Sequence, residues 1–165
     1  MRFLGERGRL GTVLLLLLVL QFALRPLLGD TRIAPDFLFL ALMVYAIRAR
    51  PGHGAAAGFL VGLLKDALSP AAFGAGALAN TIVGYFAAWG KAVFFADNLF
   101  VNVAFFFLGS WLCDILVLLF GQHLTGAALF RQIVYLSPLK ALTTATAGIV
   151  ILLIFRRWLD IRIRE

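Results

Sequence analysis

Charged side chains that could do chemistry lie within or at the edges of long apolar blocks of the sequence: Asp36, Lys65, Asp66, Asp114 and Lys140. A charge at the centre of a membrane helix costs about 2.5–3.5 kcal/mol on insertion scales. Each of these residues therefore needs a charged or polar partner, or a water-filled cavity. Intramembrane charges of this kind mark proton relays, substrate sites or structural ion pairs.

Catalytic chemistry fits the pattern poorly. The two histidines, His53 and His123, fall in expected loops at opposite ends, so they cannot converge with carboxylates on a metal ion. Asp66 and Asp114 lack the flanking motifs of an intramembrane protease. No histidine is placed to activate a serine of the apolar blocks, namely Ser69, Ser110 or Ser137. We therefore expect no enzyme activity, no metal and no cofactor.

Asp114 and Lys140 are the best-matched pair. Asp114 stands about eight residues before the end of its apolar block, and Lys140 stands about eight after the start of its own. At a rise of about 1.5 Å per residue, the two side chains lie at nearly the same depth. This placement predicts an ion pair between helices, close to a backbone opened by Pro138. The alternative is a lysine that extends to the interface beside a protonated aspartate.

The composition requires a membrane around these residues. Of 165 residues, 62% are hydrophobic and 14% are charged, and the mean hydropathy is +0.98. A soluble domain of this length needs far more polar surface. The net charge of +7 comes from basic residues at the ends of apolar blocks, where lipid headgroups attract them. We therefore expect membrane lipid, and no nucleic acid, as the neighbour of this charge.

The apolar blocks predict an all-α, polytopic membrane protein with a single transmembrane domain over residues 1–165. A span needs about 20 residues, and the six expected spans are 10–28, 33–48, 52–66, 71–90, 99–121 and 133–155, with four or five spans as the alternative. The first block imitates a secretory signal but lacks a cleavage site of small residues, so we expect it to be retained. The second and third are short helices of a hairpin that turns at Arg48–Gly52. One span of 30 residues with two arginines in its middle is the alternative.

The positive charges orient these spans. With six spans, ten of the fifteen basic residues lie on the side of the two termini, which the positive-inside rule makes cytoplasmic. This topology places Asp36, Lys65, Asp66, Asp114 and Lys140 together in the outer half of the membrane, joined by Arg25. A proton relay would also need acidic residues within spans in the inner half, where the sequence has none.

Small residues form a strip on the third block. Gly54, Gly58 and Gly62 are spaced by four, and a looser strip in the fourth block contains Gly74 and Gly76. Such strips let two helices approach closely. The partner of the strip is either another helix of this chain or a helix of a second protein, and the spacing leaves both open.

Two stretches resemble the MreD family of rod shape-determining membrane proteins. One is Pro35–Leu40, with its proline–aspartate opening. The other is Gly58–Pro70, a glycine-rich apolar helix that ends in Asp66 and leads into a short loop; it is followed by the small residues of Phe73–Leu78 and by Gly84-Tyr85. The similar region covers roughly residues 33–89. Lys65 departs from the pattern, which has an apolar residue beside the aspartate, and it could pair with Asp66.

The resemblance implies a non-catalytic scaffold of the cell-elongation machinery in the bacterial inner membrane. Its helices would bind MreC, a bitopic protein, and through it MreB filaments and the peptidoglycan glycosyltransferase/transpeptidase pair. Asp36 and Asp66, carried over from the family pattern, would either cap helix ends or serve a partner.

The implied fold also resembles that of the S-components of energy-coupling-factor transporters. A substrate-binding transporter subunit is therefore the alternative function. The fifth block favours the scaffold, because its phenylalanines are expected to face lipid or a partner, away from the polar cluster. They are Phe100, Phe105, Phe106 and Phe107, preceded by Phe94 and Phe95.

Overall fold

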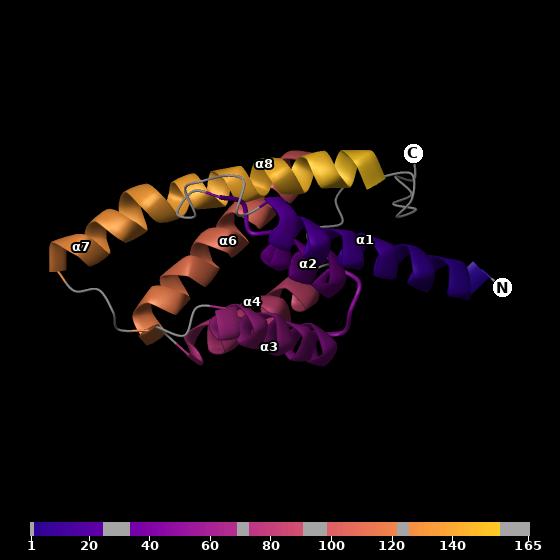
Figure 1. Ribbon diagram of the computed structural model, residues 1–165, viewed down its shortest axis with the longest axis horizontal. Helices are drawn as coiled ribbons and strands as arrows, with labels where there is room; N and C mark the ends of the chain where they lie inside the picture. Colours follow the sequence, from indigo (N-terminus) through magenta and orange to yellow (C-terminus); the bar gives the residue numbers. More distant parts are fainter. Residues whose placement is uncertain (1, 25–33, 69–72, 91–98, 122–125, 156–165) are drawn as a thin grey trace.

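The computed structural model describes residues 2–24, 34–68, 73–90, 99–121 and 126–155, and this part of the chain is helical (Figure 1). The first four helices are α1 (Arg2–Leu24), α2 (Phe37–Ala46), α3 (Pro51–Leu68) and α4 (Ala75–Trp89). They are followed by α6 (Leu99–Gly121) and by one continuous helix made of α7 (Gly126–Arg131), the π-helical turn η2 (Gln132–Leu136) and α8 (Ser137–Phe155).

The short helix α2 forms the centre of the molecule. All of its residues except Tyr45 are buried, because α1, α3, α4, α6 and α8 all contact it. A helix that is apolar on every side is expected at such a position. At 10 residues it is about 15 Å long, half the thickness of the hydrocarbon layer. Its first turn, which begins after Asp36, lies inside the folded body, because Phe37 to Leu40 are all buried.

The helices α2 and α3 are separate, as the sequence predicts. The first ends at Ala46, and a turn leads to Pro51, the first residue of α3. Proline suits this position because the first residues of a helix have no internal partner for their N–H groups. The turn rules out a single long span through Arg48 and Arg50.

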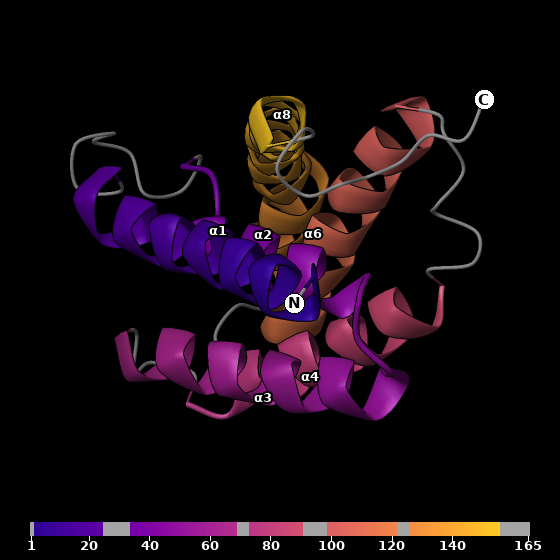
Figure 2. The ribbon, with the colours of Figure 1, turned by 90° about the vertical axis from the view of Figure 1, so that its right-hand side faces the viewer.

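The helices α3 and α4 lie side by side as one layer, and α8 crosses α6 on the opposite side of the molecule (Figure 2).

The phenylalanines of α6 do not all face outward. Phe105 and Phe106 are 8% and 1% exposed and belong to the core, which corrects the expectation that they contact lipid or a partner. Phe94 and Phe95 lie outside the described residues.

The last helix begins at Gly126, earlier than the expected start near residue 133. Its π-turn ends directly before Ser137 and Pro138, and the N–H group of Ser137 donates to the carbonyl of Gln132, five residues earlier.

Within the described residues, two helical stretches are long and apolar enough to cross a membrane, Val101–Gly121 and Gly126–Ile151. Shorter apolar helices cover Leu14–Ala23 and Phe37–Ala46.

Candidate functional site

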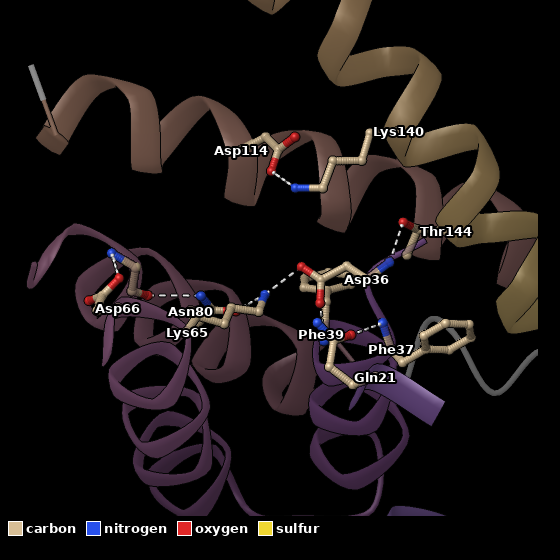
Figure 3. A network of polar contacts seen from close by, with 11 residues as sticks. Gln21, Asp36, Phe37, Phe39, Lys65, Asp66, Asn80, Asp114, Lys140 and Thr144 are labelled. Atoms are coloured by element: carbon tan, nitrogen blue, oxygen red, sulfur yellow. Dashed lines mark hydrogen bonds and ion pairs between the residues drawn. The ribbon is translucent and has the colours of Figure 1, made fainter. Parts of the chain in front are cut away.

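Four of the charged residues predicted from the sequence lie near the start of α2, namely Asp36, Lys65, Asp114 and Lys140, whereas Asp66 lies apart from them at the start of α4 (Figure 3). Asp36 precedes the helix, and its Oδ1 accepts a hydrogen bond of 2.9 Å from the N–H of Phe39, as an N-cap residue does. Its other oxygen, Oδ2, lies 2.7 Å from Nζ of Lys65 on α3. The carboxylate therefore stabilises the helix end and pairs with a charge from a second helix.

Lys65 is satisfied on several sides. Besides the ion pair with Asp36, its Nζ donates to Oδ1 of Asn80 at 3.4 Å and lies 5.6 Å from the centroid of the Phe39 ring. The sequence also allowed Lys65 to pair with Asp66, but in the structure Lys65 pairs with Asp36. Neighbouring residues on a helix point in directions about 100° apart, so adjacent side chains do not face each other.

Asp66 caps a different helix. Its carboxylate accepts hydrogen bonds from the N–H groups of Gly74 (2.9 Å), Gly76 (3.1 Å) and Ala77 (2.9 Å) at the start of α4. Gly74 has a φ of +97°, in the left-handed region that glycine adopts without strain. Asp66 is 6% exposed, so α4 and the end of α3 enclose it. Capping a helix end was one of the two roles expected for this residue.

The ion pair predicted between Asp114 and Lys140 is confirmed. Lys140 Nζ on α8 lies 2.7 Å from Oδ1 of Asp114 on α6, with the side chains 24% and 17% exposed. Lys140 does not turn away to the interface, which was the alternative. Figure 3 shows this pair facing Asp36 and Lys65 from the opposite layer.

Besides Asn80, two further neutral residues complete the network, and sequence reasoning found none of the three. Gln21 on α1 accepts a hydrogen bond of 3.1 Å from the N–H of Phe37, and Thr144 on α8 accepts one of 3.2 Å from the N–H of Asp36. The N–H groups of Asp36 and Phe37, at the start of α2, thus find partners on two of its neighbours, α8 and α1. Gln21, a single polar residue near the end of an apolar block, gives a sequence signal for such a contact. Thr144 gives none, because a threonine in a helix usually bonds to its own backbone.

The strip Gly54, Gly58 and Gly62 is a packing seam within the chain. A Cβ atom added to any of these glycines would collide with backbone of α4, at Gly84, Asn80 and Gly76 respectively. The seam leaves no room for a helix of a second protein, which corrects the docking alternative. Of the looser strip, Gly76 lies in the seam against Asp66, whereas a Cβ on Gly74 would meet nothing within 4 Å.

The arrangement balances charge and joins helices. Asp36 and Lys65 connect α2 with α3, and Asp114 and Lys140 connect α6 with α8. Among the described residues, no three His, Cys, Asp or Glu side chains are grouped to hold a metal ion. Arg25, expected beside this cluster, lies outside the described residues. The described cluster is suited to holding helices in register in a medium that cannot hydrate them.

A family model described as "rod shape-determining protein MreD" matches residues 1–160 of the chain. No curated protein and no solved structure matches it.

Proposed function

The chain belongs to the MreD family of rod shape-determining proteins, and from this premise we propose that it is a non-catalytic scaffold of the bacterial cell-elongation machinery. We propose further that it is a multi-pass protein of the inner membrane. In this proposal residues 1–165 form one transmembrane domain of six spans, and both termini are cytoplasmic.

The observation that carries the proposal is the pairing of the intramembrane charges with one another. Asp36 holds Lys65 and Asp114 holds Lys140, each at 2.7 Å, while Asp66 is occupied by backbone N–H groups of α4. Each ion pair joins two helices, so the charges hold neighbouring helices in register and favour a fixed shape that other proteins can recognise.

The proposed partner is a bitopic protein of the MreC type, bound through its transmembrane helix. Through it, the scaffold would reach MreB filaments and the peptidoglycan glycosyltransferase/transpeptidase pair. Because the glycine seam is filled by α4, the partner helix would bind to outward apolar faces such as those bearing Phe59 and Leu60 of α3, which are 47% and 65% exposed. Van der Waals contact with such a face would give the affinity, and lipid would cover the remainder.

The test is affinity purification of the tagged protein from its native membrane in mild detergent, followed by mass spectrometry. An unrelated tagged membrane protein of similar abundance is the control. Recovery of the MreC-type protein with peptidoglycan-elongation enzymes supports the scaffold. Recovery of ATPase subunits with a coupling membrane protein would replace it with the substrate-binding subunit of a transporter. Recovery of neither would contradict the proposal.

A further inference from the structure

The helices α3 and α4 form a layer that is hardly taller than one of them alone. They run antiparallel, because Gly54 near the start of α3 lies against Gly84 near the end of α4. Further along, Gly62 lies against Gly76, near the start of α4. Asp66, close to the end of α3, caps that start. The two helices are therefore matched along their length, without a stagger that would add height.

The outward surface of this layer is apolar. On α3 its exposed apolar side chains begin after His53 and continue to Leu68, while Lys65 turns inward to Asp36. The sequence contains no charged residue between positions 67 and 90. We call this surface the short face and define it by its large exposed side chains: Phe59, Leu60, Leu78, Tyr85, Phe86 and Trp89.

The short face does not reach across an ordinary bilayer. The helix α4 has 15 residues, which makes it about 22 Å long. On α3, His53 and Leu68 are also separated by about 22 Å at the same rise per residue. The hydrocarbon layer is about 30 Å thick, so the face is about 8 Å shorter than the layer.

Both ends of the short face are marked. Trp89 is 70% exposed at the last residue of α4, and tryptophan is enriched at the membrane–water interface. At the other end, Gly74 lies in a turn with a φ of +97°, and non-helical backbone does not lie in hydrocarbon exposed to lipid. Tilting would only reduce the height of these helices, and the turn has no charged side chain that could extend to the interface. The lipid must therefore adapt to the protein here.

The opposite layer is longer. Val101–Gly121 of α6 is apolar over about 31 Å, and Gly126–Ile151 of the last helix over about 39 Å. Figure 2 shows α3 and α4 on one side of the molecule and α8 on the other. Long helices can match a bilayer by tilting, which short ones cannot do. The protein thus meets lipid with two faces of unequal length.

We propose that the short face binds boundary phospholipids with short acyl chains and thins the bilayer beside it, whereas the face of α8 takes lipid of ordinary chain length. Shorter chains bring the headgroups of the two leaflets to Trp89 and to the turn before α4 at once. This lipid preference rests on the proposed insertion of the chain into the membrane and not on its scaffold role. A partner helix bound at Phe59 and Leu60 would displace these lipids, and relief of the mismatch would add to its affinity.

The experiment compares the lipids next to the two faces of the purified full-length protein. In a Cys113→Ala background, a bimane fluorophore is attached to Leu60→Cys on α3 or, as the matched control, to Leu142→Cys on α8; these leucines are 65% and 51% exposed. The host vesicles are dioleoyl phosphatidylcholine with a trace of spin-labelled phosphatidylcholine, which quenches a neighbouring fluorophore. Part of the host is then replaced by short-chain dimyristoleoyl or long-chain dierucoyl phosphatidylcholine. The recovery of fluorescence shows which lipid displaces the quencher from each face.

At Leu60→Cys the short-chain lipid should displace the quencher about threefold better than the host lipid, because the mismatch cost is modest and is shared among several lipids. At Leu142→Cys the short-chain lipid should have no advantage. Equal preferences at the two positions would overturn the short face, as would a preference for the long-chain lipid at Leu60→Cys. Quenching at Leu142→Cys alone would also overturn it, because another protein surface would then cover the face.

Absence of quenching at both positions would have a different meaning. It would show that the chain is not inserted as proposed, and the lipid preference would be overturned together with that premise. Should either labelled variant fail to fold, Phe59→Cys and Leu139→Cys, at positions 47% and 42% exposed, give the same comparison with the same expected outcomes.

Discussion

Breaking the pair between Asp114 and Lys140 one residue at a time should destabilise the protein more than removing both charges. The two charged atoms lie 2.7 Å apart, and the side chains are 17% and 24% exposed. Removing one partner of a buried pair costs about 3–5 kcal/mol, because the other charge is left uncompensated. Since these side chains keep some exposure, we expect about 3 kcal/mol for either Asp114→Leu or Lys140→Met.

The double variant should cost less than about 1 kcal/mol, because well-packed apolar residues often replace a buried pair without loss. The coupling energy between the two sites would then be about 5 kcal/mol. For a chain of this size, 1 kcal/mol corresponds to about 2–4 °C in melting temperature, so each single change should lower it by about 6–12 °C.

The assay is thermal unfolding in detergent, followed by intrinsic fluorescence, for the native protein, both single variants and the double variant. The reversed pair, Asp114→Lys with Lys140→Asp, should be tolerated better than either of its single changes. A double variant as unstable as the sum of the two single variants would refute the reasoning.

Three further predictions concern the remaining contacts. Gly58→Ala should destabilise the protein because a Cβ there collides with the Asn80 carbonyl, whereas Gly52→Ala, which meets nothing within 4 Å, should not; equal melting temperatures would contradict the seam. Asp66→Ala should cost about 2 kcal/mol through loss of the cap of α4, and hydrogen exchange at the amides of Gly76 and Ala77 should accelerate; unchanged exchange would show that the cap is unimportant. Lys65→Met should lower the melting temperature, and Asp36→Asn added to it should recover part of the loss, whereas purely additive losses would mean that the two charges do not interact.

Depth along a helix could be predicted from the sequence. Asp114 and Lys140 were matched because a fixed rise per residue gives each position a depth, and antiparallel spans bring equal depths together. The turn between α2 and α3 could also be predicted from the sequence, because arginines, proline and glycine cluster there. The existence of the charged cluster followed from the cost of leaving such residues in lipid.

Direction around a helix could not be predicted. Lys65 is adjacent to Asp66 in sequence but pairs with Asp36, which is 29 positions away, because the two neighbours point to different sides of α3. The glycine strip was recognised, but its partner depended on which helix lies beside it. Gln21 and Thr144 gave little signal, because single polar side chains in apolar blocks usually bond within their own helix.

The most direct test of the account is the binding of a purified MreC-type partner to this protein in nanodiscs, compared between the native chain and the double variant Asp114→Leu with Lys140→Met. If the pair serves the fold and the outward faces serve the partner, both proteins should bind with Kd values within about threefold of each other, a difference of less than about 1 kcal/mol. Absence of binding to the native chain would contradict the scaffold. A folded double variant that no longer binds would make the ion pair part of the functional site.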